Sequence, residues 1–204
     1  MNTARGRRAA ILAGFFLLAL VNCGGGGGGG NDSGGGPVVA DFAASCPNSD
    51  SCASNAVTSQ KGSAAGNVVE VQFWLNKLNT TIGEASLDVT FDPSVAEYQG
   101  PSGSYPGYAE GTALGGSSGG TVYQVSVVGP GEVLADIAPP KGGMSISSPA
   151  ILITLTFKLL KTSAGSNLNF RNPDRLDGSA LYSSNGVIIP LSSSKWFGGI
   201  FAGT

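Results

Sequence analysis

Residues 150–160 read AILITLTFKLL, and their alternation decides the fold class. One series of side chains is entirely apolar and consists of Ile151, Ile153, Leu155, Phe157 and Leu159. The opposite series is mostly polar and consists of Leu152, Thr154, Thr156, Lys158 and Leu160. A period of two is typical of a β-strand that buries one face, because successive side chains point to opposite sides. The stretch therefore predicts a strand whose first series faces a core.

The same period recurs along the second part of the chain. The alternating segments are residues 67–78, 85–93, 121–128 and 132–138, with shorter runs at 167–170, 186–191 and 195–201. Gly129-Pro130-Gly131 separates two of these segments and is typical of a hairpin turn. No segment of this part repeats apolar residues at a helical period. We therefore predict an all-β domain of about nine strands, a sandwich or a barrel, and favour the sandwich.

The first 22 residues have the pattern of an export signal. Residues 1–8 carry three arginines and no acid, and residues 9–21 are apolar throughout. Thirteen apolar residues fall short of the roughly 20 that a membrane-spanning helix needs. Leu20-Val21-Asn22-Cys23 resembles the bacterial lipobox, in which the cysteine is lipidated and becomes the new N-terminus. We expect an exported protein anchored by lipid at Cys23, at the outer membrane or cell surface.

Residues 23–66 are predicted to form a tether and a stalk. Residues 24–36 are almost all glycine and behave as a flexible coil with a reach of roughly 20 Å. If Cys23 carries lipid, only Cys46 and Cys52 remain, and an exported compartment favours their pairing in a disulfide. Turn-forming residues between the two cysteines allow that ring to close. The globular domain is then expected to span residues 67–204.

Composition narrows the classes of function. Without the signal the chain has eight basic and thirteen acidic residues, a net charge of −5, which argues against a nucleic-acid partner. The chain has no histidine, which excludes Ser-His-Asp and Cys-His catalysis and most zinc sites. The outward acids Asp88, Glu132 and Asp136 are typical of a solvated strand face. Asp174 and Asp177 miss the spacing of a calcium loop. We expect no catalysis, metal or cofactor.

Two stretches resemble cohesin domains. IGEASLDVTFDPSVAEY (residues 82–98) resembles the second and third cohesin strands with their aromatic-Asp-Pro turn. AILITLTFKLLKTSAGSNLNF (residues 150–170) resembles a later cohesin strand, the loop of small residues after it and the next strand. The resemblance implies a nine-stranded jelly-roll sandwich over residues 67–204. It also implies a dockerin partner, the calcium-loaded module of secreted polysaccharide-degrading enzymes.

Two kinds of ligand remain open. As a protein-binding module, the domain would use a surface that the resemblance places on adjacent strands, formed by Leu134, Asp136, Leu152, Thr154 and Thr156. As a carbohydrate-binding module, it would stack sugar faces on aromatic rings, for which the candidates are Trp74, Tyr105, Tyr108 and Trp196. Three aromatic rings in one plane would favour the sugar.

Overall fold

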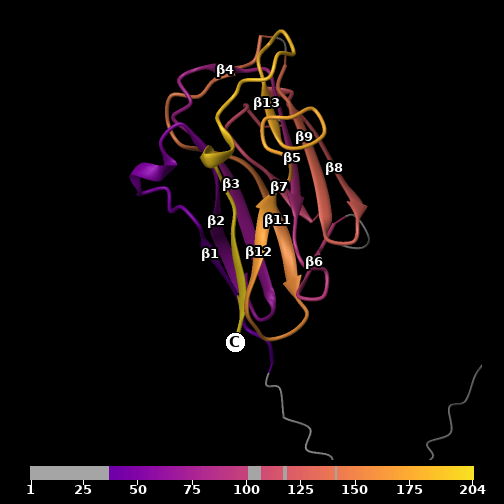
Figure 1. The fold of residues 1–204 in the computed structure, drawn as a ribbon. Helices are drawn as coiled ribbons and strands as arrows, with labels where there is room; N and C mark the ends of the chain where they lie inside the picture. The colour runs from indigo at the N-terminus through magenta and orange to yellow at the C-terminus, as the bar shows by residue number, and fades with distance from the viewer. Residues whose placement is uncertain (1–36, 101–106, 117–118, 141) are drawn as a thin grey trace, which may run out of the picture. The chain divides into compact units, whose positions relative to one another are not determined.

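Two β-sheets packed face to face form the domain (Figure 1). The computed structural model describes residues 37–100, 107–116, 119–140 and 142–204. The strands are β1 (Ala40–Ala44), β2 (Ala56–Ala65), β3 (Val68–Asn76), β4 (Thr81–Ile82), β5 (Glu84–Thr90), β6 (Ala96–Tyr98), β7 (Tyr108–Glu110), β8 (Val122–Gly129), β9 (Glu132–Ala138), β10 (Met144–Ser145), β11 (Ala150–Leu159), β12 (Ser163–Phe170), β13 (Ala180–Tyr182), β14 (Trp196–Phe197) and β15 (Gly199–Gly203). The described residues also include two short 3-10 helices, η1 (Ser51–Ala53) and η3 (Ser193–Lys195).

The strands are distributed over two main layers and one small pair. The first sheet has the order β1-β15-β12-β5-β9-β8, and β13 also pairs with β5. The second sheet has the order β14-β2-β3-β11-β6, and β7 also pairs with β11. Strands β4 and β10 form a separate pair. The predicted all-β jelly-roll sandwich is confirmed, and none of the described residues forms a helix long and apolar enough to cross a membrane.

Aromatic side chains from both sheets meet in the core between the layers. Phe157 of the second sheet packs against Phe201 of the first, with ring centroids 5.0 Å apart. Phe73 and Phe170 make a second contact between the sheets at 5.8 Å. All four side chains are buried, and offset or edge-on ring pairs stabilise beyond the area they bury. The alternation in the sequence therefore reports the true inner faces of β3 and β12, and of β11 from Ile153 onward.

The alternation of β11 fails at one point. Ile151 lies opposite Trp74, but Ile153 already lies opposite Phe73, so Leu152 is an extra residue in the strand. Such a β-bulge interrupts the regular succession of faces. Leu152 is consequently buried and Ile151 only half-buried, whereas Ile153, Leu155, Phe157 and Leu159 face the core as expected. The prediction that Leu152 faces solvent is wrong.

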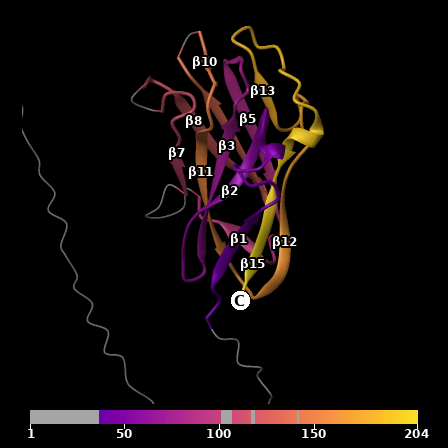
Figure 2. The same ribbon diagram turned by 90° about the vertical axis from the view of Figure 1, so that its left-hand side faces the viewer.

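The folded domain also begins earlier than residue 67. Strand β1 pairs with β15, and β2 pairs with β3 along nearly its whole length, so both belong to the sheets and not to a stalk. Apolar side chains of both strands, Phe42 and Val57 among them, are buried in the core. The view in Figure 2 shows β1 and β2 lying along the body of the sandwich.

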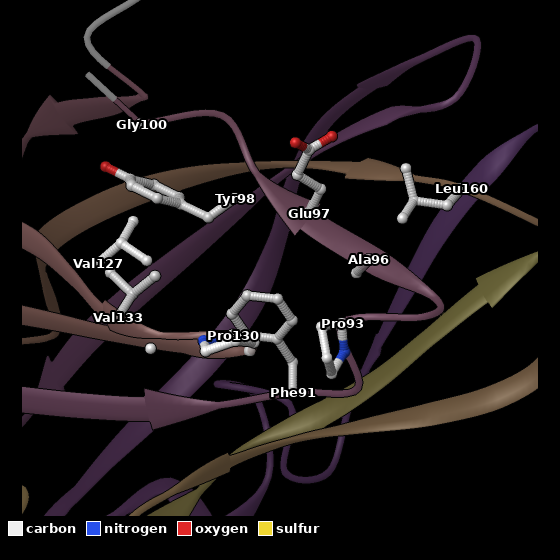
Figure 3. A pocket seen from close by; sticks show the side chains of 12 residues that line it. Phe91, Pro93, Ala96, Glu97, Tyr98, Gly100, Val127, Pro130, Val133 and Leu160 are labelled. Atoms are coloured by element: carbon white, nitrogen blue, oxygen red, sulfur yellow. The ribbon is translucent and has the colours of Figure 1, made fainter. Parts of the chain in front are cut away.

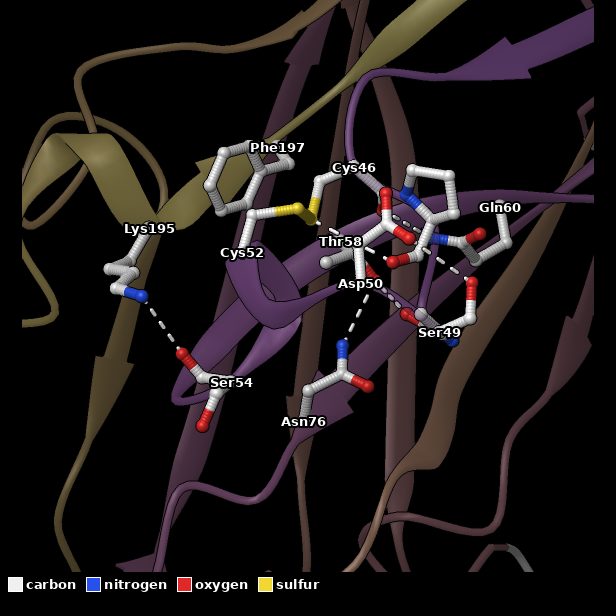
Figure 4. The surroundings of a disulfide bond; sticks show 12 residues. Cys46, Ser49, Asp50, Cys52, Ser54, Thr58, Gln60, Asn76, Lys195 and Phe197 are labelled. Carbon is white, nitrogen blue, oxygen red and sulfur yellow. Dashed lines mark hydrogen bonds between the residues drawn. A yellow bond between two sulfur atoms is a disulfide. The ribbon is translucent and has the colours of Figure 1, made fainter.

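The predicted disulfide is present and fixes the loop between these two strands (Figure 4). Cys46 and Cys52 are bonded, with their Cα atoms 6.2 Å apart. Gln60 donates a hydrogen bond to the Cys46 carbonyl (2.8 Å), and Thr58 donates one to Asn48 (2.6 Å). Asn76 in turn donates to the Thr58 hydroxyl at 2.9 Å. The loop is therefore attached to the outer face of β2 and β3.

Candidate functional site

An acidic depression of about 400 Å³ marks the outer face of the first sheet. Strands β5 and β9 form its floor, since Ser86 lies opposite Asp136 and Asp88 lies opposite Leu134. Strand β8 and the loop after β12 form its sides. Its charged and large apolar lining includes Glu84, Asp88, Glu132, Leu134, Asp136, Arg171, Leu176 and Asp177.

An ion-pair network crosses this floor. One guanidinium nitrogen of Arg171, Nη1, donates to Asp88 Oδ2 at 2.7 Å and to Glu132 Oε1 at 2.9 Å. Arg171 follows directly on β12, so a single side chain joins the ends of β12, β5 and β9. Hydrogen bonds between ionised groups are about twice as strong as neutral ones. The network therefore holds the acids of the floor in fixed positions.

Asp88 is the buried member of this network. The residue is 4% exposed, and its second oxygen, Oδ1, has no hydrogen-bond partner within the described part of the chain. Burial raises the pKa of the Asp88 carboxyl above its ordinary value, and the hydrogen bond from Arg171 opposes that rise. Because Oδ1 is itself buried, a donor that enters the depression meets the less buried acids, Glu84, Glu132, Asp136 and Asp177.

Backbone contacts position the loop that follows Arg171. The amide of Arg171 donates to the Asp88 carbonyl at 2.8 Å, and the Ser179 hydroxyl donates to the same carbonyl at 2.9 Å. Asp174 accepts hydrogen bonds from the Trp196 indole (2.9 Å) and the Leu191 amide (3.1 Å). Asp174 therefore has a structural role, and the described residues contain no group of acids or cysteines arranged to hold a metal ion.

Apolar side chains lie among the acids of the depression. Leu134 is half-buried in the middle of β9, between Asp88 on β5 and Ser126 on β8. Leu176 projects from the loop after β12 and is 82% exposed. An exposed apolar centre within a charged rim is the usual composition of a protein-binding surface.

The predicted partner surface is divided between the two sheets. Leu134 and Asp136 lie in the depression, on the outer face of the first sheet. The other predicted residues, Leu152, Thr154 and Thr156, belong to β11 of the second sheet. The prediction that Leu134 and Leu152 lie on adjacent strands is therefore wrong. Thr154 is also buried, because β3 and β7 pair on both sides of it. Alternation reports the two faces of a strand but not the sheet to which the strand belongs, so it could not separate β9 from β11.

The aromatic candidates for sugar binding do not share a surface. Trp196 is 7% exposed and packs edge-on against Phe170 in the core. Trp74 is half-buried on the outer face of the second sheet, where it lies opposite Thr58. Tyr108 stacks with Tyr123 at 6.3 Å near the edge of the sandwich, and Tyr105 lies outside the described residues. The three described rings therefore form no flat row.

A second hollow, of about 460 Å³, lies between β6 and the β8–β9 hairpin (Figure 3). Figure 3 shows Val127 and Val133 beside the ring of Tyr98, with Phe91 and the two proline rings on the opposite side. Tyr98 is 8% exposed, and burial raises the pKa of its hydroxyl to about 12. The inner face of β8 is thus left partly uncovered at this end of the sandwich.

Fold and site together are those of a two-layer β-sandwich with an acidic depression on one sheet and a disulfide-fixed loop. The family model of the cohesin domain matches residues 54–185, more than half of the chain. The chain therefore belongs to the cohesin family.

Comparison with solved structures agrees with this assignment. The chain is similar to the type II cohesin–X–dockerin complex from Acetivibrio cellulolyticus, at 15% identity and a TM-score of 0.50, with 69% of this chain and 92% of that chain covered. It is also similar to the second type II cohesin module of the adaptor ScaA scaffoldin from Acetivibrio cellulolyticus, at 14% identity and a TM-score of 0.50, with coverages of 78% and 85%. The search of curated proteins found no match.

Proposed function

We propose that this protein is a non-catalytic binding module that receives a dockerin-type protein partner on the outer face of β12, β5, β9 and β8. The observation that carries the proposal is the position of Leu134 and Leu176 among the acids of a preformed depression. The similar type II cohesin from Acetivibrio cellulolyticus was crystallised in complex with an X–dockerin partner. This complex supports the same class of partner for the present chain.

Charge indicates what the partner presents. Five carboxylates line the depression, at Glu84, Asp88, Glu132, Asp136 and Asp177, against the single guanidinium of Arg171. A complementary partner carries lysine or arginine opposite this surface, and attraction between exposed charges weakens as salt screens it. Binding through this face is therefore expected to weaken with ionic strength.

The proposed setting follows from the sequence. A basic, apolar leader that ends at Cys23, followed by a glycine tether, supports a lipid-anchored module exported to the outer membrane or cell surface. There it would retain enzymes of polysaccharide breakdown or components of a surface assembly. Replacing Cys23 with serine should abolish lipid labelling and leave an unprocessed precursor. Palmitate incorporation into the Cys23→Ser variant would refute the anchor.

The end at which the described chain begins lies away from the proposed face. The described chain begins beside β1, which ends the first sheet at the edge opposite to β8. Val39 and Thr204 exchange backbone hydrogen bonds of 2.9 and 3.1 Å, so the first described residues lie next to Thr204. Neither residue lines the acidic depression.

Binding to a panel of calcium-loaded dockerin modules, measured by calorimetry with the full chain, tests the function. Leu134→Asp should abolish any binding that the parent shows. Leu160→Asp is the matched control, because Leu160 is an exposed leucine (45%) at the end of β11 on the other sheet. Loss of binding in both variants, or in neither, would reject this face. A parent that binds no dockerin would reject the partner class.

A further inference from the structure

Strand β8 is an open edge without the usual protection. It ends the first sheet, and its backbone groups form no hydrogen bond except with β9 among the residues that the structure describes. An antiparallel strand directs only every second residue's N–H and C=O groups to one neighbour, so the others face outward. The eight residues of β8 contain no charge and no proline. Natural sheets usually place such residues on an edge to prevent further pairing.

The other terminal strands of the two sheets are short. Strand β2, which β14 covers only at Val57 and Thr58, carries the charged Lys61 along its remaining length. In the described structure, β6 and β7 have three residues each and β14 has two. Strand β1 has five residues, and its Ala40 amide already donates to the Gly66 carbonyl at 2.7 Å. An ion pair of 2.7 Å between Asp41 and Lys61 also lies at that edge. Of these terminal strands, β8 alone is both long and open.

The side chains of β8 are exposed on both faces. Val122 and Val128 are 64% and 57% exposed, and Val128 lines the acidic depression on the outer side. Val127 is 58% exposed and lines the second hollow on the inner side, where Figure 3 shows it beside Tyr98. A bulge between Val127 and Gly129 marks the end of regular pairing.

We propose that β8 pairs with β8 of a second copy of this chain, antiparallel about a two-fold axis at Val125. In this register Val122 of each copy lies opposite Val128 of the other, and Tyr123 lies opposite Val127. The exposed valines of one copy are thus covered by those of the other. A two-fold interface must be self-complementary, and an uncharged strand with valines near both ends meets that condition.

The register can be tested by a charge swap at two exposed positions. Val122→Lys/Val128→Lys places like charges opposite each other twice in the dimer, whereas Val122→Lys/Val128→Glu places opposite charges there. Sedimentation of the full chain in mild detergent should show a dimer for the parent. We expect about tenfold weaker dimerisation for the Lys/Lys variant, and dimerisation restored for the Lys/Glu variant. At a concentration where parent and variants are monomeric, both variants should keep the parent's unfolding midpoint, because their changes are on the surface.

Cross-linking gives an independent measurement. Val125→Cys in a Cys23→Ser background places one thiol of each copy at the two-fold axis, within reach of a short bismaleimide. Val187→Cys, which is exposed and lies outside β8, is the control. A covalent dimer with Val125→Cys alone supports the pairing. The pairing of β8 with itself would be overturned if the parent were monomeric, if both cysteine variants cross-linked equally, or if the two charge variants sedimented equally. If the parent is monomeric, β8 remains open to a strand of another protein.

Discussion

Asp88 shows how a single residue links the stability of the domain to its binding face. Its carboxyl is almost completely buried, and among the described residues Arg171 is the only cation that lines the depression with it. Burial raises the folded pKa of Asp88 above its ordinary value of 3.8. A group of this kind contributes most to stability below its unfolded pKa, and that contribution is lost as the pH rises through the folded pKa.

Replacing Arg171 with methionine should therefore destabilise the domain in a pH-dependent manner. The change removes the hydrogen bond that opposes the rise, so the pKa of Asp88 rises further. The difference in unfolding free energy between variant and parent is expected to be small at about pH 3 and to grow toward about pH 7. Urea unfolding at several pH values measures it. When Asp88→Asn is present in both proteins, the difference in unfolding free energy caused by Arg171→Met should no longer depend on pH. If that difference is already constant with pH while Asp88 is present, Asp88 is not the source of the destabilisation.

At the scale of elements, the bulge in β11 decides which leucines belong to the core. Leu152→Ala removes a fully buried side chain and should lower the free energy of unfolding by about 3 kcal/mol. Leu134→Ala on the half-buried outer face of β9 should cost less than about 1 kcal/mol. Chemical denaturation of the two variants measures both values. Equal costs would contradict the face assignment of β11 or of β9.

The same strand shows how far sequence patterns predict an element. From Ile153 to Leu159 the alternation gives the buried face correctly, because the strand pairs regularly with β3 from Ile153 to Lys158. It fails at Leu152, since a bulge depends on the partner strand and leaves no local signal in a run of apolar residues. The outward positions of Glu132, Leu134 and Asp136 follow from alternation alone. The ion pairs of Arg171 do not follow from alternation, because they form only when β12 pairs with β5.

At the scale of the whole molecule, sequence reasoning found the fold class and missed the start of the domain. Small and polar residues around the cysteines are typical of a stalk, and β1 is only five residues long. Its pairing partner β15 lies at the far end of the chain, so no local pattern predicts that pairing. Strand β2 carries a register shift between Lys61 and Ala64, which obscures its alternation. Long-range pairing, and not local propensity, places these strands in the sandwich.

Truncation tests whether residues 37–66 are an essential part of the fold. A chain of residues 67–204 lacks β1 and β2, and with them Phe42, Val57 and the pairing partner of β3 along one whole edge. It should show no cooperative unfolding transition and should bind hydrophobic dyes, because the core is left open on that side. A chain of residues 37–204 keeps every described strand and should unfold in one transition with the midpoint of the full-length protein. Circular dichroism measures the thermal unfolding of both chains. If residues 67–204 unfold cooperatively at the same midpoint as residues 37–204, the fold does not need β1 and β2, and residues 37–66 are a stalk.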